Sequence, residues 1–250
     1  MYMPIEPQPD CVSAWREATK TVEGQKGHHA SNVIIGVENP LLRASLADPA
    51  VEAVDAFLRS KGKKGVDTVA NTLFPAGLYR RHGAPKFYQR FEENVLPVVG
   101  KSDRWSGYYF ERMIRLPNGQ GKPVNQLADI VARIKNPNVR ARNKFELQIF
   151  DPLRDVDNSP YGGQCLSFAS FKLRKENGVD VLDLTAMYRN HFYIEKLLGN
   201  IIGLGQLMDF IAKEGRVTVG AMTLVSTHAQ VDRPDSTSTA EIAALLEACA

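Results

Sequence analysis

The chain has 250 residues, of which 44% are hydrophobic and 24% are charged, and it carries a formal net charge of +3 at pH 7. This composition is ordinary for a soluble globular protein, and the length allows one sizeable core or two small ones. The mild positive charge gives no case for nucleic-acid binding, although it would favour a small anionic substrate.

The sequence shows few signals for membrane insertion, secretion or disulfide formation. The longest apolar runs are shorter than a membrane span, and the first residues lack a signal-peptide pattern, so we expect no membrane association. The three cysteines, Cys11, Cys165 and Cys249, form no C-x-x-C pair. The sequence therefore predicts neither a disulfide framework nor a metal site, and it favours a cytoplasmic location.

In the first half of the chain, residues 1–31 are polar and interrupted by Pro and Gly, and we expect a poorly ordered N-terminal lead-in. The His28-His29 pair within it is typical of a solvated turn. A short strand is expected at 32–36. Asp48 before Pro49 predicts a capped helix over 48–58. Further helices are expected at 66–73, stopped by Pro75, and at 85–95.

In the second half, apolar residues at helical spacing predict a helix over 124–135, and alternation predicts a strand over 144–150. Strands at 164–173 and 179–187 flank Asn177-Gly178, a favoured hairpin turn. The longest helix is expected at 193–213, a strand at 217–226 and a terminal helix at 239–248. Three glycines fall inside the long helix, and close packing against a sheet would compensate for their low helix propensity. We expect residues 32–250 to form a single α+β domain with a mixed, antiparallel-rich sheet packed with helices.

One constellation carries chemistry. Cys165 lies in the apolar segment Gly163-Gln-Cys-Leu-Ser-Phe-Ala-Ser-Phe-Lys-Leu173, and Arg189 and Asn200 follow. Together they offer a thiol nucleophile, a phosphate-binding cation and an amide that can read a base edge, which suggests chemistry on a pyrimidine nucleotide. Taken singly, each has a simpler interpretation: an inert packed thiol, a surface cation and a helix-capping amide.

From about residue 124 to 232 the chain resembles thymidylate synthase and its relatives, the pyrimidine hydroxymethylases. Five segments carry the resemblance: 125–142 with its Asn-Pro break and arginine pair, 163–173 around Cys165, Tyr188-Arg-Asn190, 200–207, and 223–230. Arg189 and Asn200 keep the family's separation without a gap. The resemblance implies a thymidylate-synthase-like fold and a dimer that forms through a face of the sheet.

The resemblance also implies a role for each matched residue. Cys165 would add to C6 of the pyrimidine, so that C5 can accept a methyl or hydroxymethyl unit from methylenetetrahydrofolate or a related reduced pterin. Arg189 would bind the phosphate and favour the thiolate. Arg140 and Arg142 would reach the phosphate in the neighbouring subunit, Asn200 would bind the edge of uracil in a nucleotide such as dUMP, and His228 would bind the sugar.

The chain departs from the family pattern mainly where folate and protons are handled. The family's catalytic glutamate has no counterpart, and Asn71 stands nearest to its place. Leu166 replaces a His, Phe192 replaces an Asp, and Gln230 replaces a Tyr. Two alternatives therefore stay open: a folate-independent pyrimidine nucleotide enzyme, or a catalytically silent nucleotide-binding protein. His191 beside Arg189 is a further candidate base, and an aromatic among Trp105, Tyr108 and Tyr109 could cover a bound ring.

Overall fold

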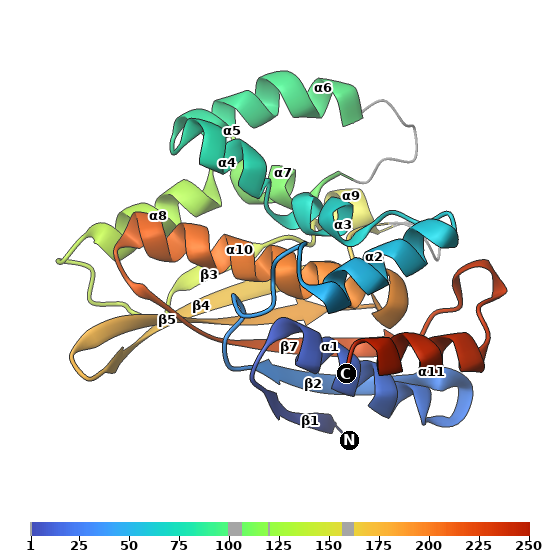
Figure 1. Cartoon of the computed structure of the whole chain (residues 1–250). Helices are drawn as coiled ribbons and strands as arrows, with labels where there is room; N and C mark the ends of the chain where they lie inside the picture. The colour runs from blue at the N-terminus through green and yellow to red at the C-terminus, as the bar shows by residue number, and fades with distance from the viewer. Residues whose placement is uncertain (1, 100–106, 120, 157–162) are drawn as a thin grey trace.

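The structure is a computed structural model that describes residues 2–99, 107–119, 121–156 and 163–250. Its centre is a seven-stranded mixed sheet with the strand order β1-β2-β7-β5-β4-β3, in which β6 also pairs with β7 (Figure 1). The strands are β1 (Met3–Gln8), β2 (His29–Val37), β3 (Phe145–Gln148), β4 (Leu166–Glu176), β5 (Val179–Tyr188), β6 (His191–Phe192) and β7 (Thr218–Gln230). The mixed α+β class expected from the sequence is confirmed.

Helices α8 and α10 lie over the sheet, and α4, α5 and α6 form a layer further from it (Figure 1). The helices are α1 (Cys11–Glu23), α2 (Pro49–Ser60), α3 (Val66–Leu73), α4 (Ala76–His82), α5 (Lys86–Arg90), α6 (Leu96–Val99), α7 (Tyr109–Ile114), α8 (Gln126–Lys135), α9 (Pro152–Asp155), α10 (Leu198–Gly215) and α11 (Thr239–Ala248). Two wider helical turns, η2 (Phe91–Val95) and η3 (Tyr193–Leu197), lead directly into α6 and α10.

The two faces of the sheet differ in character. In β5, Leu182, Leu184, Ala186 and Tyr188 are buried, whereas Thr185 and Met187 between them are exposed. The exposed face carries a row of apolar side chains that are direct neighbours across four strands: Phe168, Met187, Val225 and Ile34. We call this row the open-face row. Met187 is 38% exposed and the other three are partly exposed, so an apolar stripe faces outward.

The expectation that residues 1–31 lack regular structure is wrong. Asp10 caps α1, since its carboxylate accepts a hydrogen bond from the Ser13 amide at 2.8 Å, and α1 buries Trp15 against the core. Strand β1 pairs in parallel with β2. The prolines in this segment suggested a broken chain, but β1 lies at the edge of the sheet, where proline is tolerated.

Elements with strong local signals form as expected. Helices α3 and α11 have the expected bounds, and α2 begins after Asp48, whose carboxylate accepts from the Ala50 amide at 2.9 Å. Asn177 and Gly178 both have positive φ, as the tight hairpin turn between β4 and β5 requires. Strand β7 continues four residues beyond the expected end to Gln230, which places His228 inside the strand.

Candidate functional site

A cavity of about 610 Å³ opens where the start of β4, strand β6 and the first turn of α10 meet α3 and α7. Polar and charged side chains from five segments line it: Lys64, Thr68, Thr72, Tyr108, Tyr109, Gln164, Cys165, Asn190, His191, Lys196 and Asn200. Apolar walls come from Val69, Val99 and Phe192. The structure therefore brings Cys165 and Asn200, which are far apart in sequence, into one cavity.

Cys165 lies directly before β4 and is partly buried, whereas Cys11 and Cys249 are buried in the core. Burial raises the pKa of the Cys165 thiol above its ordinary value, and the positive charges of Arg189 and Lys196 oppose that rise in pKa. The nearby cations thus lower the Cys165 pKa as expected, but burial raises that pKa by more than the cations lower it. Cys165 remains protonated at neutral pH in the chain without ligand.

Arg189 is tied to the cysteine segment by its backbone and its side chain. Its amide donates to the Cys165 carbonyl at 2.8 Å, and its Nε donates to the Gln164 carbonyl at 3.0 Å. The Thr227 hydroxyl on β7 donates to the Arg189 carbonyl at 3.0 Å. The guanidinium is therefore held at the end of β5, beside Cys165, on an exposed residue that an anion can reach.

Asn200 stands on the first turn of α10 and is only 4% exposed. Its amide nitrogen Nδ2 lies 3.0 Å from Nε2 of His191, and Nδ1 of His191 lies 3.0 Å from the Ser226 hydroxyl oxygen. The Tyr193 hydroxyl donates to the same Ser226 oxygen at 3.2 Å. These four side chains form a buried chain of hydrogen bonds behind the cavity wall, which we call the Asn200 network.

His191 does not have the properties of the candidate base. Burial lowers the pKa of its imidazole to about 3, so the ring stays neutral at physiological pH. Its ring stacks on Tyr188 with 4.0 Å between centroids, and Tyr193 meets it edge-on at 5.6 Å. His191 is a fixed, neutral hydrogen-bonding group in the wall of the cavity.

Tyr109 is a neighbour of Cys165 that the sequence suggested only as a possible cover for a bound ring. Its hydroxyl oxygen accepts a hydrogen bond from the Leu166 amide at 3.4 Å, and burial raises the pKa of its phenol above its ordinary value. Because that oxygen accepts from the backbone, its own O–H remains able to donate to another group. Of the aromatic cluster considered from the sequence, Tyr108 and Tyr109 line the cavity, and Trp105 lies outside the described residues.

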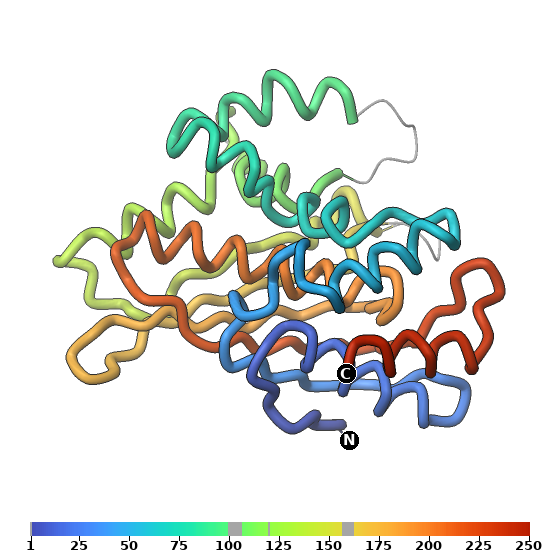
Figure 2. The backbone as a smooth tube through the Cα atoms, viewed as in Figure 1, coloured from blue at the N-terminus to red at the C-terminus, as the bar shows by residue number. Residues whose placement is uncertain are grey.

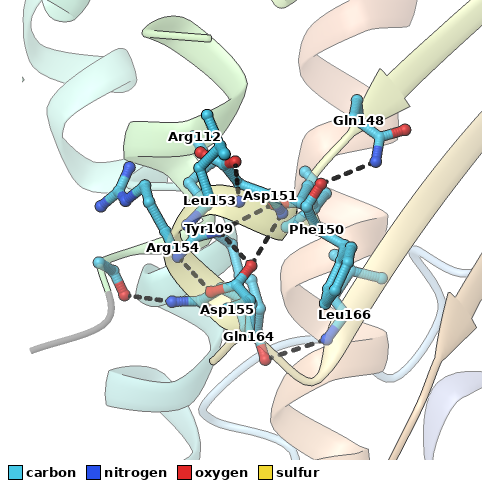
Figure 3. Close-up of polar contacts among 12 residues, drawn as sticks. Tyr109, Arg112, Gln148, Phe150, Asp151, Leu153, Arg154, Asp155, Gln164 and Leu166 are labelled. Atoms are coloured by element: carbon cyan, nitrogen blue, oxygen red, sulfur yellow. Dashed lines mark hydrogen bonds and ion pairs between the residues drawn. The ribbon is translucent and has the colours of Figure 1, made fainter. Parts of the chain in front are cut away.

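A buried ion pair positions the helix that carries Tyr109 (Figure 3). Arg112 on α7 contacts both carboxylate oxygens of Asp155 on α9, and its guanidinium also donates to the Ile149 carbonyl at 3.1 Å. The Asp155 carboxylate accepts the Asp151 amide at 2.9 Å, and the guanidinium beside it lowers the Asp155 pKa below its ordinary value despite the opposing effect of burial. α7 is thereby fixed to the segment that follows β3.

Four predicted site residues are not among those that line this cavity. One of them, Arg189, lies beside Cys165 as described above. Arg142 lies beside the far end of β4, where its carbonyl accepts from the Leu173 amide and its guanidinium pairs with Asp180. Arg140 is exposed nearby. His228 faces His29 across β2 and β7, with 5.7 Å between ring centroids, and does not line the cavity. Asn71, which stands nearest to the missing glutamate's place, does not line the cavity either, although its neighbours on α3 do.

Lys64, Lys196 and Asn190 also line the cavity without having been identified as functional residues from the sequence. A helical spacing could have identified Lys196, because it precedes Asn200 by four residues and shares its helix face. The side-chain oxygen of Asn190 is buried, and within the described part of the chain it has no hydrogen-bond partner. That oxygen is an acceptor that a ligand N–H or O–H could satisfy.

Within residues 2–99, 107–119, 121–156 and 163–250, no three His, Cys, Asp or Glu side chains gather in a way that could hold a metal ion. Likewise, none of the helices described is both long and apolar enough to cross a membrane.

Comparison with known proteins finds two distant relatives. The chain is 26% identical over 145 residues to a protein of Methanococcoides burtonii named "Putative thymidylate synthase", covering 58% of this chain and 62% of the relative. It is 25% identical over 144 residues to a protein of the same name from Methanosarcina mazei, covering 57% and 61%. The matches thus span about three fifths of the relatives' length. The search against protein-family models found no match. These findings support a distant relationship to thymidylate-synthase-like proteins.

Proposed function

We propose that this chain is a thymidylate-synthase-like transferase that adds a one-carbon unit, methyl or hydroxymethyl, to C5 of a pyrimidine nucleotide such as dUMP. The observation that carries the proposal is the shared cavity. A partly buried thiol at Cys165, a base-reading amide at Asn200 and the cation of Lys196 meet there, and Arg189 lies beside Cys165. The names of the two distant relatives support the same activity.

In the proposed reaction, the Cys165 thiol would give its proton to water, and its sulfur would form a bond to C6 of the ring. The electrons of the C5–C6 double bond would then move toward C5 and O4, which makes C5 nucleophilic. Asn200 would donate one N–H to O4, where negative charge develops, and its carbonyl would accept N3–H. C5 would form a bond to the one-carbon unit, and the donor would keep the electron pair of the bond that it loses. Loss of the C5 proton to water would then restore the C5–C6 double bond as the C6–sulfur bond breaks and the thiolate leaves.

Binding of the nucleotide phosphate would involve the cations at the cavity. Lys196 and Lys64 line the cavity and offer point charges, and Arg189 beside Cys165 offers a guanidinium fork. Within the described residues, no ion pair involves Lys64, whereas Lys196 lies 3.7 Å from Glu195. We propose that Tyr109, whose O–H remains able to donate, carries a proton near Cys165.

A reduced pterin fits the residues present. The cavity volume lies within the range of small-molecule sites, and Val69 and Phe192 give it apolar walls for a flat ring. The unpaired oxygen of Asn190 would accept a ring N–H. When bound, a methylenetetrahydrofolate-type group supplies the one-carbon unit and, for a methyl product, the reducing equivalent. Phe192, Val69 and Asn190 are the residues that would hold it.

We also propose a thymidylate-synthase-like fold that functions as a dimer through the exposed face of the sheet. The open-face row offers a continuous apolar stripe to a second copy. Arg142 supports the same assembly. It lies beside Leu173, eight residues along β4 from Cys165, or roughly 26 Å at the rise of a strand. It is therefore too far to serve its own cavity, and only a second chain could bring it to a bound phosphate.

The decisive experiment is intact-mass spectrometry after incubation with 5-fluoro-dUMP, with and without methylenetetrahydrofolate. Fluorine at C5 does not leave as a proton does, so the reaction stops with the nucleotide bound through Cys165. We expect a ternary adduct with the wild type and none with Cys165→Ser. Cys249→Ser is the matched control, because that thiol is buried in the core and its loss should leave the adduct intact. A wild type that stays unmodified while it binds the nucleotide would contradict the transferase.

One observation favours a second candidate, a folate-independent enzyme that uses the same thiol addition. Within the described residues the cavity wall contains no Asp or Glu, so no carboxylate from them holds a pterin or moves a proton. An adduct that forms without folate, together with tritium release from C5-labelled dUMP, would favour proton exchange or dehalogenation at C5.

A further inference from the structure

We propose that His191 is a positioning residue that fixes which way the Asn200 amide faces and so selects uracil over cytosine nucleotides. This inference rests on the function proposed above. It assigns a role to a side chain that need not touch the substrate, and it depends on the direction of each hydrogen bond in the Asn200 network.

The directions follow from the donors available. The amide nitrogen of Asn200 can only donate, so Nε2 of His191 must accept at 3.0 Å. A neutral imidazole carries one N–H, which therefore sits on Nδ1 and donates to the Ser226 oxygen at 3.0 Å. The same oxygen also accepts the Tyr193 hydroxyl. Each link of the network is thus consistent with a single tautomer of His191.

The hydrogen bond to His191 determines which groups of the Asn200 amide remain available to a ligand in the cavity. One N–H of its amide is used by His191, which leaves the carbonyl oxygen and the second N–H for a ligand. Uracil presents a donor at N3 and an acceptor at O4, which match that pair. Cytosine presents an acceptor at N3 and a donor at C4, which oppose it. With the ring proton on Nδ1, turning the amide over would place its oxygen against the lone pair of Nε2. The flipped amide would require the other tautomer, with Ser226 donating to Nδ1, so His191 opposes the orientation that cytosine needs as long as its proton stays on Nδ1.

The imidazole is held firmly enough for this role. It is 1% exposed, stacks on Tyr188 with an interplanar angle of 12°, and belongs to β6, which pairs with β7. Its low pKa, about 3, keeps a second proton off Nε2 at physiological pH, so the acceptor is always present. A side chain of similar size without an acceptor would leave the amide free to rotate.

The test compares dUMP and dCMP affinities by calorimetry for the wild type and three His191 variants. The wild type should prefer dUMP by about tenfold or more. In His191→Phe and His191→Asn, which cannot offer an acceptor at the place of Nε2, the preference should fall to within about threefold. His191→Gln, whose side-chain oxygen can reach that place, should restore it. A general loss of structure would weaken the binding of dUMP and of dCMP alike and leave the ratio of the two affinities unchanged.

The outcomes separate this inference from the proposed function. A wild type that binds neither nucleotide refutes the proposed function and the inference with it. A wild type that prefers dUMP, with a His191→Phe variant of equal preference, refutes the inference alone. If His191→Phe does not fold, nitrogen-15 NMR of the labelled wild type decides. A proton on Nδ1 and none on Nε2 supports the inference, and the opposite tautomer refutes it.

Discussion

At Cys165 two opposing influences act on one thiol. Burial disfavours the thiolate, whereas Arg189 and Lys196 favour it, and burial is the larger influence. A ligand that changes the solvation of the cavity would change this balance. The reactivity of the thiol therefore depends on the balance between burial and these two positive charges.

We predict that alkylation of Cys165 by iodoacetamide accelerates as pH rises from about 7 to about 10, with a midpoint above that of a free cysteine. The sign follows from the raised pKa, because the thiolate is the reactive form. Replacing Lys196 by Met removes a charge that lowers the thiol pKa, so alkylation at a fixed pH should slow by roughly twofold or more.

Peptide mapping by mass spectrometry would follow Cys165 separately from the two buried thiols. Lys64→Met is the matched control, because Lys64 lines the same cavity but does not contribute to the shift of the Cys165 pKa. Equal slowing in both variants would mean that cavity shape, not charge, controls the thiol.

Sequence alone predicted Cys165, Arg189 and Asn200 as site residues because fixed spacing within a resemblance marks them. It named Tyr109 only as a possible cover for a bound ring. It could not show that Tyr109 contacts the Cys165 segment, since Tyr109 lies 56 residues before Cys165 and meets Leu166 only through tertiary packing. It also gave His191 a candidate basic role, against which its burial and low pKa argue. The chemistry of a residue was readable from sequence, whereas its solvation depended on tertiary structure.

Between elements, the contact of α10 with α3 shows how a weak helix sequence is compensated. Gly199 and Gly203 face α3, and a Cβ on Gly203 would lie 2.7 Å from the Ala70 carbonyl oxygen. Gly205 instead approaches the Pro40 carbonyl oxygen at 2.4 Å by the same measure. The close packing expected for these glycines is therefore present, but against a helix and a loop instead of the sheet.

We predict that Gly203→Ala destabilises the protein by about 1–3 kcal/mol, although alanine favours helices. The added Cβ would clash with the backbone of α3, and moving that backbone costs free energy. Urea unfolding measures the change. Gly77→Ala in α4 is the control, since its added Cβ meets nothing closer than 4.0 Å and should be neutral or stabilising. A Gly203→Ala variant as stable as the wild type would show that α3 shifts freely, and the cavity that α3 lines would then be adaptable.

Element prediction succeeded where a cap or turn residue marks the boundary, as at Asp48 and Asn177-Gly178. It failed for β1 and α1. There, prolines dominated the local signal, but pairing with β2 and burial of Trp15 overrode it. Whether a proline interrupts a strand depends on the strand's place in the sheet, which local sequence does not contain.

For the whole molecule, the open-face row and Arg142 are both consistent with the proposed dimer. The row offers an apolar surface to a second copy of the chain. Arg142 is too far from the cavity of its own chain to reach a ligand there. A back-to-back dimer would connect the two observations, since it would hide the row and bring each Arg142 toward the other chain.

We predict that the wild type sediments as a dimer and that Met187→Glu sediments as a monomer with weaker dUMP binding, because a charge in the apolar row opposes its burial. Val98→Glu is the control, since Val98 is 67% exposed on α6, in the helical layer away from the sheet. Arg142→Ala should stay dimeric and still lose affinity. Full affinity in a monomeric variant would exclude a shared site.

The two ends of the chain meet in the finished molecule: β2 pairs with β7 from His29–Gln230 to Val37–Met222, and Arg16 on α1 donates to the Leu246 carbonyl at 2.9 Å (Figure 2). This arrangement affects the order in which parts of the chain can fold during synthesis. β1 and β2 leave the ribosome long before β7 is synthesised, so β2 cannot pair with β7 until most of the chain has been made. Closing so long a loop carries an entropic cost that local structure cannot offset early. The N-terminal strands and the cavity, whose lining residue His191 contacts Ser226 on β7, are therefore completed together and late.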